Sequence, residues 1–96
     1  MLISKGIAVG EVVTVKTTSG EELLAKLVER TDSTITVSRA VVLTAGSKGI
    51  ALVPYLFTTD PDANIVINLN NVIVMAATGK DAADQYIQQT TGIKLA

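Results

Sequence analysis

Residues 11–37 read EVVTVKTTSGEELLAKLVERTDSTITV, and this stretch decides the fold. Val13 and Val15 alternate with polar residues, a period of two that directs one side chain toward a core and the next toward solvent. Small polar residues at 18–21 are typical of a tight hairpin turn, and those at 31–33 interrupt the alternation again. The stretch therefore predicts antiparallel strands over 11–18, 22–30 and 34–45.

One residue of the third strand conflicts with its pattern. Arg39 falls in the apolar register that Ile35 and Val37 begin. A bulge near Ala40 would shift the phase of the alternation, and an inward charge with a partner would also explain the position. A bulge is the simpler interpretation.

The segment 50–57 is apolar on both faces, which predicts a strand buried on both sides. It contains Pro54, which cannot donate to a sheet ladder and belongs on an edge strand. An apolar edge strand tends to aggregate unless another chain or element covers it. We therefore expect a subunit interface here, formed by Leu52, Val53, Tyr55 and Phe57.

The remaining segments complete one domain over 1–96. An extended lead-in covers 1–10, a loop covers 58–64, and strand patterns at 65–67 and 72–77 flank an asparagine-rich bend. Apolar residues then follow at helical spacing, and Gly92 suits the end of a helix. The expected strands occupy about 11–77, and the expected C-terminal helix occupies about 79–91.

Composition agrees with a mostly β fold and excludes several functional classes. Val, Ile and Thr supply 33 of 96 residues, and these β-branched types favour strands. The formal charge of −1 gives no overall basic field that would attract a polyanion. The absence of Cys and His excludes disulfides, Cys/His zinc sites and histidine acid–base catalysis. We expect a non-enzymatic protein that needs no cofactor.

Two short motifs resemble functional sites, but a simpler structural interpretation is stronger for both. The sequence Gly46-Ser47-Lys48-Gly49 lacks the spacing of a phosphate-binding loop and precedes a strand, which favours a hairpin turn. The acids of Asp60-Pro61-Asp62 are too few oxygen ligands for a calcium site, which favours solvated loop acids. We predict no metal site and no catalytic residue. Because the start of the chain does not resemble a signal peptide, and because 50–57 is too short to span a bilayer, a cytoplasmic protein without membrane contact is expected.

The strand segments also follow the order of a known pattern. An apolar strand at 13–16, a glycine turn, a leucine-centred strand at 23–27 and an aspartate break at 32–37 are similar to the first motif of the Sm/LSm family. The segment 65–75, with its central Asn-Asn-Val-Ile, resembles the second motif. The resemblance to this family, which includes bacterial Hfq, covers about 12–77. Leu52-Val53-Pro54 and the terminal helix look like the small Sm-like proteins of marine phages (cyanophages), which suggests a viral source and a location inside the phage-infected host.

The resemblance implies a strongly bent, five-stranded Sm-like barrel of the SH3 type. In this family the fourth and fifth strands pair between neighbours and close a ring, here of about five to seven subunits. That pairing would cover the apolar edge and would add Val72 and Val74 to the interface. Family rings hold single-stranded RNA on the loop after the second strand and on the loop between the last two strands. By position these loops hold Asp32, Thr36, Asn68, Asn70 and Asn71. The nucleic-acid-binding residues expected here also include the cations Arg30 and Lys48.

Departures from the family pattern leave two functions open. Asn68 stands where the family has an arginine, so the loop lacks the usual cationic hydrogen bonds. The asparagines at 68, 70 and 71 either only turn the chain or turn it and also contact nucleotides. One hypothesis is a ring that binds single-stranded RNA or DNA. The other is a structural ring that binds proteins through its helix or the Tyr55–Phe57 segment.

Overall fold

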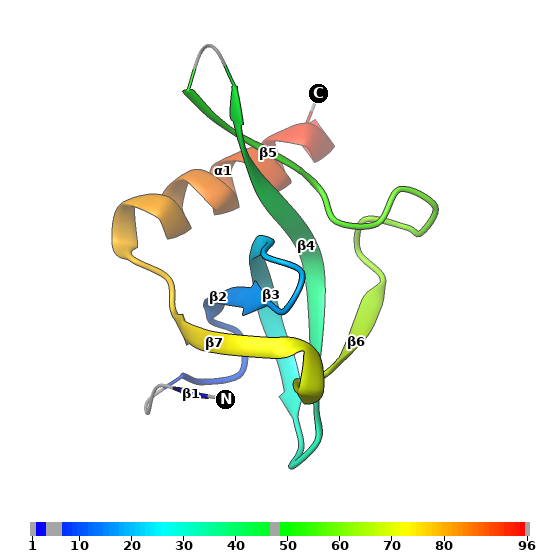
Figure 1. Ribbon diagram of the computed structural model, residues 1–96. Helices are drawn as coiled ribbons and strands as arrows, with labels where there is room; N and C mark the ends of the chain where they lie inside the picture. The colour runs from blue at the N-terminus through cyan, green and yellow to red at the C-terminus, as the bar shows by residue number, and fades with distance from the viewer. Residues whose placement is uncertain (1, 4–6, 47–48, 96) are drawn as a thin grey trace.

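The computed structural model describes residues 2–3, 7–46 and 49–95 (Figure 1). Strands dominate this part of the chain, and one α-helix follows them. In chain order the elements are β1 (Leu2–Ile3), β2 (Val12–Thr17), β3 (Glu22–Arg30), β4 (Thr34–Gly46), β5 (Gly49–Pro54), β6 (Asn64–Asn68), the 3-10 helix η1 (Leu69–Asn71), β7 (Val72–Ala77) and α1 (Lys80–Leu95). The predicted mostly β domain with a C-terminal helix is confirmed.

The strands form one sheet in the order β1-β7-β2-β3-β4-β5, and β6 pairs with β4 outside this row. The pairing of β1 with β7 is parallel, and the other pairs are antiparallel. β2, β3 and the first part of β4 lie side by side, as the alternation over 11–37 predicts. Val13 pairs with Ala25, and Leu27 pairs with Val37.

Alternate residues of these strands share one core. Val13, Val15, Ile35 and Val37 are each at most 1% exposed, because the period of two places them on the inner face of the sheet. Leu23 and Leu27 of β3 and Met75 of β7 complete the centre of the cluster. Burying a side chain of this size stabilises the fold by roughly 1.5–3 kcal/mol relative to leaving it in water.

A bulge bends β4 near its middle. Leu24 pairs with Val41 and Lys26 pairs with Ser38, so Ala25 alone faces the two residues Arg39 and Ala40. Arg39 has a φ of 53°, in the left-handed region that residues with a Cβ seldom adopt. The predicted bulge is therefore confirmed. The Arg39 side chain also has a partner, because its Nε donates to Asp62 Oδ1 at 2.8 Å on the partly exposed surface.

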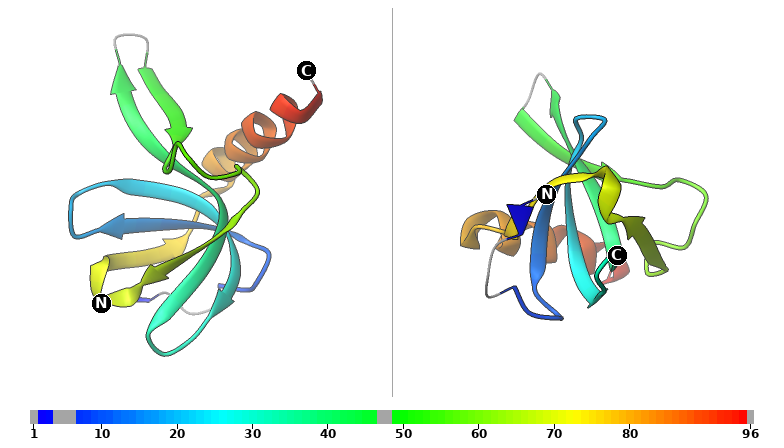
Figure 2. Two further views of the ribbon diagram at one scale, coloured as in Figure 1. Left: turned by 90° about the vertical axis from the view of Figure 1, so that its right-hand side faces the viewer. Right: turned by 60° about the horizontal axis from the view of Figure 1, so that its bottom comes forward.

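The bulge divides β4 between two partners. Residues 34–38 pair with β6, whereas residues 41–46 pair with β5. The second half of β4 and β5 project from the rest of the sheet as a two-stranded arm (Figure 2). We call residues 41–54 the arm. Lys48, between β4 and β5 in the sequence, falls outside the described residues.

The expected closed, five-stranded barrel is wrong, because the sheet is open. In the described part of the chain no ladder joins β6 to β7, which η1 connects instead. β7 pairs with β2 along one edge, and its other edge carries β1 at Val74 and Met75. The sequence predicts only an extended lead-in over 1–10, so β1 is an additional strand.

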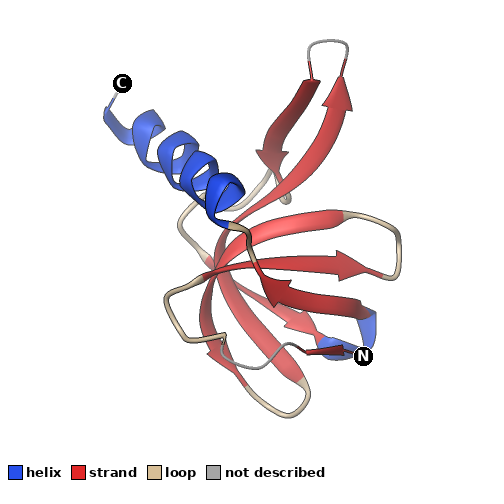
Figure 3. Ribbon diagram, turned by 90° about the vertical axis from the view of Figure 1, so that its left-hand side faces the viewer, coloured by secondary structure: helices blue, strands red, loops and turns tan. Residues whose placement is uncertain are grey.

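The C-terminal helix begins within one residue of its predicted start and ends later than predicted. It runs through Gly92 to Leu95, so the expected helix end at this glycine is wrong. Figure 3 shows α1 leaving the end of β7 near the base of the arm and pointing away from the arm. No helix in the described part of the chain combines the length and the apolar character needed to cross a membrane.

Tyr86 fastens α1 to the bulge of β4. Its side chain is 2% exposed, and its hydroxyl donates to the carbonyl oxygen of Arg39 at 2.7 Å, with that of Ser38 at 3.4 Å. Burial raises the pKa of Tyr86 to about 12, although the positive charge of Arg39 acts in the opposite direction. At the exposed first turn of α1, the hydrogen bond to Asp84 raises the pKa of Lys80.

Candidate nucleic-acid interface

Two turns that are far apart in the sequence meet at one end of the sheet. The backbone N–H of Leu69, in η1, donates to the carbonyl oxygen of Ser33 at 2.9 Å. Thr34 and Asn68 are direct partners in the ladder between β4 and β6. We call residues 31–34 and 68–71 the joined loops.

The first of the joined loops is a rigid turn built on threonine. Thr31 Oγ1 accepts the backbone N–H groups of Ser33 at 3.2 Å and Thr34 at 3.0 Å, and it lies 2.8 Å from Thr34 Oγ1. The backbone N–H of Thr31 donates to the carbonyl oxygen of Thr34 at 2.8 Å. These bonds fix the backbone, while the Asp32 side chain stays exposed at the tip.

The second of the joined loops is capped by one of its own asparagines. Asn68 Oδ1 accepts the backbone N–H of Asn70 at 3.0 Å, so the amide oxygen of Asn68 begins η1. The carbonyl oxygen of Asn71 accepts the backbone N–H of Thr18 at 2.9 Å, which ties η1 to the β2–β3 turn. The side chains of Asn68, Asn70 and Asn71 are exposed.

The joined loops carry little charge. Neither contains a basic residue, and Arg30, which pairs with Ile35 at the base of the first loop, is exposed. Thr36 is half-buried and faces Val66 in the β4–β6 ladder, outside the loops themselves. Thus Asp32, Asn68, Asn70 and Asn71 lie together, Arg30 and Thr36 flank them, and the position of Lys48 is not described.

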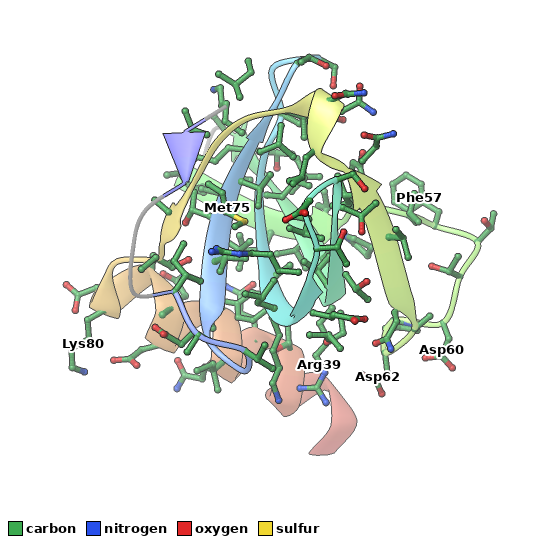
Figure 4. The ribbon with its side chains drawn as sticks, turned by 90° about the horizontal axis from the view of Figure 1, so that it is seen from below. Arg39, Phe57, Asp60, Asp62, Met75 and Lys80 are labelled. Atoms are coloured by element: carbon green, nitrogen blue, oxygen red, sulfur yellow. The ribbon has the colours of Figure 1, made fainter. Side chains whose placement is uncertain are left out.

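The expected interface residues occupy different environments. Phe57 is 82% exposed, and Figure 4 shows it at the periphery, on the opposite side of the molecule from Lys80. Leu52 and Val53 are half-buried on β5, and Tyr55 packs against the core. Val74 pairs with Leu2 of β1, whereas the Val72 side chain is buried in the core.

A cavity of about 370 Å³ lies between the arm, the 55–62 segment and α1. Its apolar residues include Val41, Leu52 and Phe57, and the Arg39–Asp62 ion pair belongs to its wall (Figure 4). Asp60 Oδ1 accepts the backbone N–H of Asp62 at 2.8 Å. The two loop acids are thus engaged in local hydrogen bonds, and the described residues contain no group of three or more side chains that could hold a metal ion.

Sequence reasoning missed the contributions of Thr18 and Tyr86 to these sites. Thr18 contacts Asn71, and Tyr86 contacts Arg39, across separations of about fifty residues. No local sequence pattern predicts such pairs, because each residue fits the pattern of its own element whether or not its partner is present. Arg39 itself was detectable, because a charge in an apolar register is visible in one strand.

No protein-family model matches this chain, and no curated protein matches it significantly. The Sm-like resemblance therefore stays a prediction.

Proposed function

We propose that this protein binds single-stranded nucleic acid, RNA or DNA, through the joined loops, as a non-enzymatic Sm-like module. The observation that carries the proposal is the 2.9 Å bond between Leu69 N and Ser33 O, which holds the two loops together. These are the two loops that the Sm resemblance assigns to RNA.

The chemistry of the joined loops suits a polar strand more than an apolar partner. Exposed asparagine amides supply both donors and acceptors, which can bond to base edges and to sugar or phosphate oxygens. Backbone positions fixed by the Thr31 and Asn68 hydrogen bonds would lose little conformational entropy on binding. With Arg30 as the cation at their base, the joined loops would bind weakly in one copy, and assembly of several copies would add avidity.

Titration of labelled U-rich and A-rich oligonucleotides at two salt concentrations tests the proposal. We expect binding that weakens with salt, with a log–log slope of about −0.7 for each phosphate that Arg30 neutralises. Asn70→Ala should reduce affinity. Asn64→Ala is the matched control, because Asn64 is an equally exposed asparagine at the far end of β6. No binding up to about 100 µM, or equal losses in the two variants, would refute the proposal.

A second candidate is a protein-binding or self-associating module, and the exposure of Phe57 favours it. An aromatic side chain that is 82% exposed beside an apolar cavity is a common feature of interaction surfaces. The formal charge of −1 is equally compatible with this function. A complex recovered from lysate that survives nuclease treatment and is lost in Phe57→Ser would favour this candidate over the first.

A further inference from the structure

A second cavity, of about 560 Å³, adjoins the joined loops. It lies between β6, the β2–β3 turn and the segment after β5, on the side where the sheet is open. Asn68 and Asn71 belong to its lining, so a strand that crosses the joined loops passes its mouth. The other lining residues come from elements that neither the composition nor the Sm resemblance connects with nucleic acid.

The lining of this cavity has one polar side and one apolar side. Thr18, Ser19, Asn68 and Asn71 supply hydroxyl and amide groups. Tyr55, Leu56 and Ile67 supply an aromatic ring and aliphatic surface. No residue of the lining carries a formal charge, so a phosphate would enter without a counter-charge, which is costly. The cavity therefore favours a neutral ligand with polar edges and apolar faces.

The polar groups of the cavity are held in place by the fold. Asn68 Oδ1 accepts the N–H of Asn70, so the Nδ2 group is the part of this amide that remains to donate to a ligand. The bond from Thr18 N to Asn71 O joins the β2–β3 turn to the end of η1, the two segments that supply the polar side of the lining. Tyr55 is anchored by its backbone N–H, which donates to Ala40 O at 3.0 Å, and by packing against the core. Such preorganisation lowers the entropic cost of binding.

We propose that this cavity receives one unpaired nucleobase, stacked on Tyr55 and hydrogen-bonded by Asn68 and Asn71. A base is flat, neutral and polar along its edges, which matches the two sides of the lining. The inference rests on the proposed function for its biological setting, because the rest of the strand would lie on the joined loops. It adds a base-binding site and its residues to that function.

Two titrations test the site separately from strand binding. In the first, uridine, cytidine, adenosine and guanosine are added to ¹⁵N-labelled protein, and the side-chain amide signals of Asn68 and Asn71 are followed. Free nucleosides carry no phosphate, and the side-chain amide signal of Asn70, which belongs to the joined loops but not to the lining, shows whether they bind the loops instead of the cavity. In the second, a U-rich or A-rich oligonucleotide is compared with the same oligonucleotide containing abasic positions.

Matched variants sharpen the test. Tyr55→Leu removes the stacking surface and keeps an apolar side chain, and we expect about tenfold weaker oligonucleotide binding. Tyr55→Phe keeps the ring and should bind like the wild type. Asn64→Ala, at an exposed residue outside both the lining and the joined loops, should leave the nucleoside-induced shifts unchanged. Circular dichroism of each variant checks that the sheet is intact.

Each outcome decides between the two proposals. Oligonucleotide binding that is insensitive to Tyr55→Leu and to abasic substitution, with no nucleoside shifts, would overturn the base site and leave the joined loops as the strand site. Nucleoside shifts without oligonucleotide binding would support the base site and overturn strand binding. Loss of both signals would overturn both.

Discussion

Arg39 shapes the molecule through its backbone as well as its side chain. Its φ of 53° creates the bulge that redirects β4, and its carbonyl oxygen receives the hydroxyl of Tyr86. Its guanidinium meets Asp62 at a partly exposed position, where an ion pair contributes at most about 1 kcal/mol. The backbone conformation is therefore the more important of its two contributions.

Replacing Arg39 separates these contributions. Arg39→Val places a β-branched residue in the left-handed region and should lower the free energy of unfolding by roughly 1–3 kcal/mol. Arg39→Asn removes the same ion pair but tolerates this φ, so its loss should be clearly smaller. Urea unfolding of the two variants measures the difference. Equal stabilities would show that the backbone conformation at 39 is not strained.

Tyr86 predicts a specific alkaline response. Its pKa of about 12 in the folded protein exceeds the ordinary value of 10.0, so the folded state retains a proton that the unfolded state loses. The contribution is complete below pH 10 and is lost between pH 10 and 12, by about 2–3 kcal/mol in total. Unfolding measured at a series of pH values should show the stability advantage of wild type over Tyr86→Phe shrinking across this window. A difference that stays constant with pH would contradict the burial of the hydroxyl. The effect of lysine titration on stability cancels in this comparison, because the two proteins have the same lysines.

For single residues, the sequence predicts those features that the pattern of one strand shows by itself. Arg39 was identifiable as a bulge because it breaks an alternation that its neighbours define. Its contacts with Asp62 and Tyr86 were not predictable, because they depend on how a loop and a helix return to β4. The same holds for Asn71, whose backbone bond to Thr18 joins two turns that appear independent in sequence.

Among the elements, η1 depends on Asn68, which has both a structural role as its cap and a proposed role in binding. The Asn68 side chain caps η1 and also lines the cavity beside the joined loops. The sequence leaves open whether the asparagines only turn the chain, and the structure supplies a way to decide. The capping role tolerates a negative charge at position 68, whereas the binding role does not, because nucleic acid is itself negatively charged.

Two substitutions of Asn68 distinguish these roles. Asn68→Asp keeps the capping oxygen, so stability at pH 7 should stay close to wild type, whereas the added negative charge should weaken oligonucleotide binding severalfold. Asn68→Ala removes the cap and should cost roughly 0.5–2 kcal/mol. Thermal unfolding and oligonucleotide titration are measured on both. Unchanged oligonucleotide affinity in Asn68→Asp would assign this asparagine to the turn alone.

The strands were largely predictable because their periodicity is local. β2, β3 and β4 follow the alternation over 11–37, and the helix begins where its pattern does. β1 was missed because two residues carry no period, and its existence depends on the edge of β7. Gly92 was misinterpreted because an isolated glycine weakens a helix without ending it when the following residues continue the turn.

At the scale of the whole molecule, the open sheet changes the expected assembly. The resemblance assigns subunit pairing to the last two strands, yet β1 already pairs with β7 at Val74 and Met75. Ile50 in the arm and Phe57, three residues beyond its end, are exposed apolar residues. Self-association through the arm therefore agrees better with the exposed surface than pairing along the full length of β7.

The native mass of the purified protein tests this expectation. We predict one closed species of about five to seven subunits, and Phe57→Ser should shift it toward the monomer because a large exposed apolar contact is lost. Val9→Ser is the matched control, because Val9 is 67% exposed but lies in the turn before β2. A monomeric wild type would refute assembly. Equal shifts in both variants would indicate nonspecific association.

The division of β4 at its bulge also has a consequence for local opening. The ladder of the arm contains the pairs from Val41–Pro54 to Gly46–Gly49, and none of these residues is in the buried core cluster, against which Val42 packs as a partly buried side chain. Breaking those hydrogen bonds exposes little of the surface that stabilises the rest of the sheet, so the arm can fray while the body stays folded. Its amide hydrogens would then exchange with solvent through brief partial openings, whereas those of β2 and β3 would exchange only when the whole domain unfolds.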